Sequence, residues 1–94
     1  MFELQEIAPG TVRLNGRLDA SQAETALNAF RRLEGPLTAD CSGLDYISSA
    51  GISVIVETYR RLKAAGKEFR LTQMQPRVRN VFMYSGLDRV LTIE

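Results

Sequence analysis

Residues 40–56 read Asp-Cys-Ser-Gly-Leu-Asp-Tyr-Ile-Ser-Ser-Ala-Gly-Ile-Ser-Val-Ile-Val, a short strand and a tight loop followed by a helix that opens on two serines. A serine side chain can accept hydrogen bonds from the free amides of a first helical turn, so Ser48 and Ser49 mark the helix start. Helical spacing links the apolar residues Ile52, Ile55, Val56, Tyr59 and Leu62. We therefore predict a central helix that buries one apolar face in the core and ends at Gly66.

A strand is the alternative for residues 52–56, because their β-branched side chains resist helix formation. The serine start, the glycine stop and a length of about 16 residues favour the helix. In the last turns of this helix, Arg60, Arg61 and Lys63 are expected to complement the helix dipole.

Short apolar segments on both sides of this helix predict the strands of a sheet. Phe2–Ile7 and Thr11–Asn15 are expected to form an antiparallel hairpin. Leu37–Cys41 and Glu68–Thr72 lie on either side of the central helix, which makes them a parallel pair with a right-handed crossover. Val90–Ile93 is a terminal strand or an extended tail. The sheet is therefore expected to be mixed.

Two further helices complete the predicted fold. In the first, Asp19 is the expected cap, Gln22 the third residue of a capping box and Gly35-Pro36 the end. Its inward stripe is Ala23, Ala26, Leu27, Phe30 and Leu33. The second begins at Pro76 and stops at Gly86, with Val78, Val81 and Phe82 inward. We predict one α/β domain over residues 1–94, with a mixed sheet of four to five strands and three to four helices.

Composition narrows the class of protein. The chain has 94 residues, 45% of them hydrophobic, which suits one core, and a net charge of +1, which argues against a nucleic-acid partner. The single cysteine, Cys41, allows no internal disulfide and is expected to be a buried, inert thiol. The sequence shows neither an apolar run of about 20 residues nor a signal peptide, so a cytoplasmic location without membrane insertion is expected.

The sequence lacks most of the residues and motifs that common catalytic mechanisms require. The chain contains no histidine, which removes the usual general base and the commonest metal ligand. A nucleophile elbow would need glycine at Ile47, and a phosphate loop ending at Lys67 would need glycine at Arg61. Asp40 and Asp45 could bind a divalent ion, but aspartates are common at strand ends and in turns, and we favour that structural explanation. No enzyme, metal or cofactor is expected.

A candidate site follows from the parallel strands, because sites in open sheets lie beyond the carboxyl ends of such strands. The loops Ser42–Ser48 and Gln73–Gln75 meet this condition, and Gly16–Asp19 joins them if its strand is parallel. Along the central helix, Ser49, Ser53, Glu57 and Arg60 form a line opposite the apolar face, free to contact a partner.

Pattern alone favours helix capping as the role of both serines. Gly51 is unusual inside a first turn, where glycine costs about 0.8 to 1 kcal/mol relative to alanine. It suggests a close approach to the backbone, either by a partner or by another helix of the same domain.

Three motifs now resemble a known family. Residues 37–52, Leu-Thr-Ala-Asp-Cys-Ser-Gly-Leu-Asp-Tyr-Ile-Ser-Ser-Ala-Gly-Ile, resemble the signature of STAS domains, found in anti-sigma-factor antagonists and at the cytoplasmic ends of sulphate transporters. Residues 14–20 resemble the family's pattern after its second strand, and residues 83–91 its closing helix and strand. The motifs occur in the family's order and span nearly the whole chain.

The resemblance implies a partner switch. An unmodified antagonist of this family binds an anti-sigma factor of the serine-kinase type, and phosphorylation of the serine in Asp-Ser-x-Gly breaks the complex. Ser49 aligns with that serine, while Ser48 stands where the family usually has aspartate. The expected site is Ser49 for phosphorylation, with the following residues for partner binding: Asp19, Ser48, Ala50, Gly51, Ser53 and Glu57.

The leading hypothesis is thus an anti-sigma-factor antagonist, monomeric when free and switched off by phosphorylation of Ser49. The alternative is a STAS domain that serves as a constitutive scaffold subunit of a lipid-transport or stress-signalling assembly. In that case the serines act only as caps and helix contacts.

Overall fold

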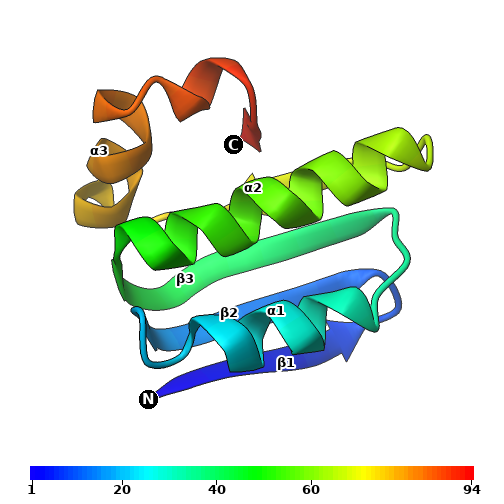
Figure 1. Ribbon diagram of the computed structural model, residues 1–94, viewed down its shortest axis with the longest axis horizontal. Coiled ribbons are helices and arrows are strands. Elements are labelled where there is room, and N and C mark those ends of the chain that lie inside the picture. Colours follow the sequence, from blue (N-terminus) through cyan, green and yellow to red (C-terminus); the bar gives the residue numbers. More distant parts are fainter.

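The computed structural model describes residues 1–94, which form one five-stranded sheet with helices packed on it (Figure 1). The strands, which follow one another across the sheet in sequence order, are β1 (Phe2–Ala8), β2 (Thr11–Leu18), β3 (Leu37–Ile47), β4 (Phe69–Thr72) and β5 (Thr92–Ile93). The helices are α1 (Ala23–Arg31), α2 (Ser49–Ala64), α3 (Pro76–Tyr84) and the 3-10 turn η1 (Leu87–Arg89). β1 and β2 are antiparallel and the other neighbours parallel, which confirms the predicted mixed α/β fold.

One face of the sheet carries the core. α1 and α2 lie across that face, and α3 packs beside the carboxyl end of β3 (Figure 1). A single cluster of 19 buried residues fills the space between the sheet and the helices. Along β3, Leu37, Ala39 and Cys41 are buried, while Thr38 and Asp40 are only partly covered. This alternation is the period of a half-buried strand. None of the helices combines the length and the apolar character that a membrane span requires.

β3 is longer than the sequence suggests. The segment Ser42–Ile47, predicted as a loop, continues β3, and Gly16–Leu18 continues β2. Both strands stay paired in parallel through two irregularities in register, and Leu44 and Ile47 are buried. Serine, glycine and aspartate favour turns locally, but the burial of these apolar residues and the pairing with β2 favour a strand.

The start of α1 also differs from the prediction. Its N-cap is Gln22, which makes no side-chain capping bond, so Asp19 is not the cap. Instead, the Asp19 carboxylate accepts hydrogen bonds from Ser21 N (3.1 Å) and Ser21 Oγ (2.6 Å) in the preceding turn. Gln22 Oε1 accepts one from Phe2 N (3.2 Å), which joins α1 to the edge strand. The predicted inward stripe is confirmed, with Ala26 and Phe30 fully buried.

α2 has the predicted start and end but a rotated buried face. Its buried residues are Gly51, Val54, Ile55, Thr58 and Leu62. Ile52, Val56 and Tyr59, expected inside, are half-buried. A threonine can occupy the buried face because its hydroxyl donates to Val54 O (2.9 Å) within the helix. Gly66 adopts a left-handed conformation (φ 73°) just after the helix, as predicted.

The predicted end of the first helix at Gly35-Pro36 is too late, because α1 ends at Arg31 with Arg32 as its C-cap. The predictions for the C-terminal part of the chain agree better. Pro76 is the first residue of α3, Val78 and Phe82 face the core, and Gly86 is left-handed after the helix (φ 76°). Val90–Ile93 shortens to β5, because the amides of Val90 and Leu91 donate to Leu87 O in the turn that ends η1. Cys41 is buried, and this burial raises the pKa of its thiol to about 12, so it stays protonated.

Arg61 has a role that the sequence did not indicate. Instead of ending in solvent, its guanidinium crosses to α1 and donates to Phe30 O (2.8 Å) and Leu33 O (3.0 Å). Phe30 O, near the end of α1, also accepts a hydrogen bond from Leu33 N (2.9 Å), and Leu33 itself lies just after the helix. Arg61 gives the Phe30 carbonyl a second donor and binds the Leu33 carbonyl where the helix has ended. Arg61 therefore couples α2 to the end of α1.

Replacing Arg61 should destabilise the fold. We expect Arg61→Met to lower the free energy of unfolding by about 2 kcal/mol, because hydrogen bonds from a charged donor are lost while the aliphatic stem is kept. Arg60→Met, at an exposed position of the same helix, is the matched control and should change it by less than about 0.5 kcal/mol. Urea unfolding measures both, and equal losses would contradict the proposed coupling.

Candidate partner-binding site at the start of α2

The ends of three parallel strands meet beside the start of α2. β2 is parallel to β3, so the segment Gly16–Asp19 meets the condition under which it was expected to join the site. Ser48 N donates to Leu18 O (3.0 Å), which holds the end of β2 against the start of α2. Gln75 Nε2 donates to Ser42 O (3.1 Å) and Asp45 Oδ1 (3.3 Å), which brings in the segment after β4. The predicted segments do assemble, at the end of the sheet where β3 turns into α2 (Figure 1).

Ser48 and Ser49 have different environments. Ser48 is the N-cap of α2, and its Oγ accepts a hydrogen bond from Gly51 N (3.3 Å). Ser49 is the first helical residue and is exposed. Its backbone carbonyl accepts a hydrogen bond from Ser53 Oγ (3.1 Å). The capping role predicted from the pattern therefore belongs to Ser48, and the Ser49 side chain is available at the surface.

Gly51 is explained by packing inside the domain. It is buried, and a Cβ at this position would collide with Leu18 O and come within 2.8 Å of Ile47 Cγ1. The close approach inferred from the sequence is thus made by the ends of β2 and β3. The interpretation of Gly51 as part of an exposed partner surface is wrong, because strand ends already cover it.

The outer face of α2 is exposed along its length. Ser49, Ser53, Glu57 and Arg60 all face solvent, as predicted. A shallow hollow of about 490 Å³ lies over Ser53, Glu57 and Arg60, and its apolar lining comes from the half-buried Ile52 and Val56. A partner would therefore meet polar groups with apolar side chains beside them, a composition typical of the surfaces of transient interfaces.

The neighbouring candidates are less prominent. Ala50 is half-buried at the start of α2, and Asp19 is half-buried at the end of β2. The hydrogen bond from the Ser21 hydroxyl is the main cause that lowers the pKa of Asp19, so its carboxylate stays ionised near neutral pH. Glu57 forms an ion pair with Arg31 of α1 (3.2 Å), both side chains being about half exposed.

One contact of this region was not predicted from the sequence. The guanidinium of Arg17 lies over the ring of Tyr46, 4.3 Å from its centroid. The two residues are register partners in β2 and β3, so the contact depends on the part of β3 that was predicted as a loop. Without that pairing, no sequence signal connects them.

The aspartates considered for a metal have protein partners. Asp40 accepts a hydrogen bond from Ser42 N (2.9 Å), the main cause that lowers the pKa of its carboxyl, and lies 3.5 Å from Arg13 Nε. Asp45 is bonded to Gln75. No three His, Cys, Asp or Glu side chains are grouped so that they could hold an ion.

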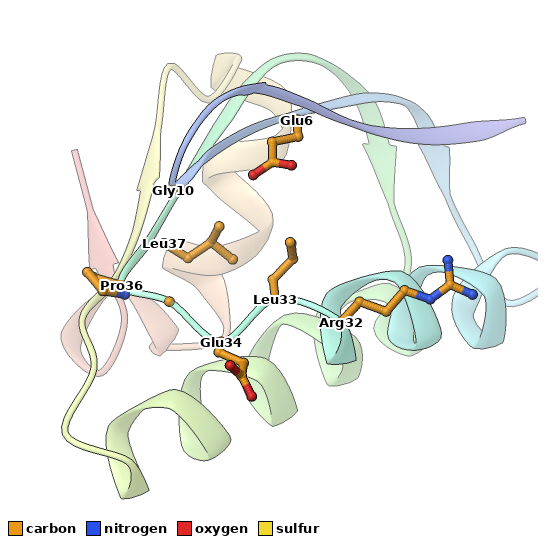
Figure 2. A pocket seen from close by; sticks show the side chains of 8 residues that line it. Glu6, Gly10, Arg32, Leu33, Glu34, Pro36 and Leu37 are labelled. Atoms are coloured by element: carbon orange, nitrogen blue, oxygen red, sulfur yellow. The ribbon is translucent and has the colours of Figure 1, made fainter.

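A second hollow, of about 380 Å³, lies near the amino-terminal end of β3, between the β1–β2 turn and the end of α1 (Figure 2). Leu33 and Leu37 line it, while the charged groups of Glu6 and Arg32 point away from each other. It presents no convergent set of polar groups, and we assign it no function.

Comparison with known proteins agrees with this geometry. Residues 3–93 match the family described as “Mlab, STAS domain”, so the chain belongs to the STAS domain family. A protein of Bordetella bronchiseptica named as the anti-sigma factor antagonist BtrV is 38% identical over 69 residues, 72% of this chain and 60% of BtrV. A Mycobacterium tuberculosis protein named as an anti-anti-sigma factor is 34% identical over 59 residues, 63% of this chain and 40% of that protein. This chain thus spans about half the length of these two relatives.

Solved structures include the anti-sigma factor antagonist SpoIIAA in two forms. The unphosphorylated form is 25% identical, with a TM-score of 0.75, and the match covers all of this chain and 88% of that one. The phosphorylated form, from Bacillus, has a TM-score of 0.69 at 24% identity and covers all of this chain and 91% of that one. The fold of this chain is therefore that of SpoIIAA.

The two serines should respond differently to truncation. Ser48→Ala removes the acceptor of the Gly51 amide and should lower the free energy of unfolding by about 1 kcal/mol. Ser49→Ala should change it by less than about 0.5 kcal/mol, since the side chain is exposed. Chemical denaturation of both variants measures the difference. A loss at Ser49 as large as at Ser48 would show that the cap is shared.

Gly51→Ala should be destabilising although alanine is the better helix former. Helix propensity alone would stabilise the variant by about 1 kcal/mol. The collision with Leu18 O should outweigh this gain and leave a net loss of about 1 to 3 kcal/mol. Thermal unfolding of Gly51→Ala measures the effect, with Ser53→Ala, at an exposed position of the same helix, as the control. A more stable Gly51→Ala variant would mean that the strand ends yield to the new methyl group.

Proposed function

We propose that this domain is an anti-sigma factor antagonist that binds an anti-sigma factor with serine-kinase activity and is released from it when Ser49 is phosphorylated. The observation that carries the proposal is the exposed Ser49 side chain at the first position of α2, beside a separate serine that already caps the helix. The names of BtrV and SpoIIAA support the same class of function.

A phosphate at Ser49 is compatible with the fold. The first amides of a helix have no intrahelical acceptor, and the helix dipole favours negative charge at this end. A phosphate carries about −1.5 to −2 charges near neutral pH. On an exposed first-turn residue it requires no burial and no displacement of a core side chain. The domain should therefore remain folded after modification.

The same phosphate should oppose binding. The line Ser49, Ser53 and Glu57, together with the hollow beside it, is the surface that we assign to the anti-sigma factor, with Ser48, Ala50 and Asp19 at its margin. A doubly charged group at the end of that line must lose its water when a partner covers it, and this cost is not recovered without a matching cation. Modification would then weaken the complex and leave the fold unchanged.

Variants at Ser49 test the binding switch. Ser49→Ala should bind the anti-sigma factor as the parent does and stay bound in the presence of ATP. Ser49→Asp should bind at least about tenfold more weakly, equivalent to a loss of about 1.4 kcal/mol. Melting temperatures of both should remain close to the parent. Calorimetric titration measures the affinities, and equal binding by both variants would contradict the switch.

The second candidate is the constitutive scaffold subunit, in which neither serine is modified. It is favoured by Ser48, because a serine in the place of the family's usual aspartate changes the residue next to the modified one and is fully explained as a cap. Incubation with an active anti-sigma kinase and ATP, followed by intact-mass measurement, separates the two. One added phosphate, absent from Ser49→Ala, supports the antagonist, and none supports the scaffold.

A further inference from the structure

The outer face of α3 carries apolar side chains between arginines. Of the six large hydrophobic residues that are exposed, two lie on α3: Met83 (50% exposed) and Tyr84 (88%). α3 buries Val78 and Phe82 in the core, and Met83 and Tyr84 lie outside that core. Single exposed apolar residues are common on protein surfaces, but two neighbouring ones on one helix, with arginines beside them, mark an interaction site more often.

The charges around this group have a single sign within α3. Arg79 and Arg77 lie on the two flanks of the exposed face, about 100° and 260° around the helix from the buried Val78, with Met83 and Tyr84 between them. α3 contains no acidic residue, and η1, which contacts α3, adds Arg89 and a single carboxylate, Asp88.

None of these arginines is neutralised within the domain. The four ion pairs of the molecule involve Arg13, Arg31 and Arg70, and no pair reaches α3 or η1. A set of unpaired arginines around exposed apolar groups is complementary to carboxylates that flank an apolar anchor. Arginine, tyrosine and methionine are also the residues enriched at the centres of protein interfaces.

We propose that the outer face of α3, defined by Arg77, Arg79, Met83 and Tyr84, is a second docking surface that takes an acidic amphipathic segment of another protein. Carboxylates of the segment pair with the arginines, and an apolar side chain covers Tyr84 and Met83. α3 stands beside the start of α2 (Figure 1), but Met83 and Tyr84 belong to a different helix from Ser49, and we expect this surface to take its partner whether or not Ser49 is modified.

A membrane is a weaker match for the same surface. An interfacial helix inserts a broad apolar face between lipid headgroups. The apolar face of α3 is committed to the core, and only two of its nine residues are large, apolar and exposed. Their side chains offer enough area for one anchor in a protein interface but too little for insertion.

NMR titration of the full ¹⁵N-labelled chain tests the proposal. The probe is a designed helical peptide with glutamates on both sides of a leucine and phenylalanine stripe, and its counterpart has lysine for every glutamate. We expect saturable shifts of the amide signals of α3 and η1 with the acidic peptide only, weakening as salt is added. Vesicles of phosphatidylcholine and phosphatidylglycerol are the third probe and should leave these signals unchanged.

Two substitutions define the surface. Arg79→Glu and Tyr84→Ser should each weaken binding of the acidic peptide by about tenfold or more. Arg32→Glu, at an exposed arginine after α1, is the matched control for charge and should have little effect. Ser49→Asp should bind the peptide as the parent does, whatever its effect on the anti-sigma factor.

Three results would overturn the proposal. The first is the absence of saturable shifts in α3 with the acidic peptide. The second is binding that moves to the outer face of α2 and is lost in Ser49→Asp. The third is a response to vesicles in place of the peptide, which would assign the arginines to lipid headgroups.

Discussion

The carbonyl oxygen of Leu18 fixes the position of the candidate site. It accepts the amide of Ser48, and Gly51 packs directly against it one helical turn further on. The end of β2 and the first turn of α2 are thereby held together through backbone atoms, which have no rotamers to change. Ser49 is two residues before Gly51, about 200° around the helix, so its side chain faces outward when Gly51 faces the strand ends. Residues of the core set the direction of α2, and this contact sets where α2 begins.

This arrangement separates residues that stabilise the fold from the residue of the proposed switch at neighbouring positions. Ser48 and Gly51 are committed to the fold, one through its hydroxyl and the other through the absence of a side chain. Ser49 and Ser53 lie on the opposite, exposed face of α2 and can change their chemistry without disturbing the core. A regulatory modification is tolerated where the affected side chain makes no contribution to packing, and the first turn of α2 provides such a position between two residues that do.

Sequence patterns predicted the elements well where local and tertiary preferences agree. The start of α2 at the serines, its end at Gly66 and the start of α3 at Pro76 all follow from capping and backbone restrictions that act within a few residues. The continuation of β3 to Ile47 did not follow, because it depends on pairing with β2 across the sheet. The bond between Arg61 and the end of α1 joins residues 28 and 31 positions apart, and no local signal encodes it. For the same reason Gly51 was recognised as unusual while its partner, Leu18, was not.

The serine at position 48 alters the electrostatics of the proposed switch as well as its sequence. An aspartate cap would place a carboxylate next to Ser49, where it would use the same first-turn amides and repel a phosphate on the following residue. Ser48 caps Gly51 with a neutral hydroxyl, so the positive end of the helix dipole is not already compensated by an adjacent charge. A phosphate on Ser49 would then interact with the helix end without a neighbouring anion. Compared with aspartate, Ser48 would therefore make a phosphate on Ser49 easier to accommodate. If the proposed kinase discriminates against this motif, the discrimination would have to arise in recognition and not in the stability of the phosphorylated product.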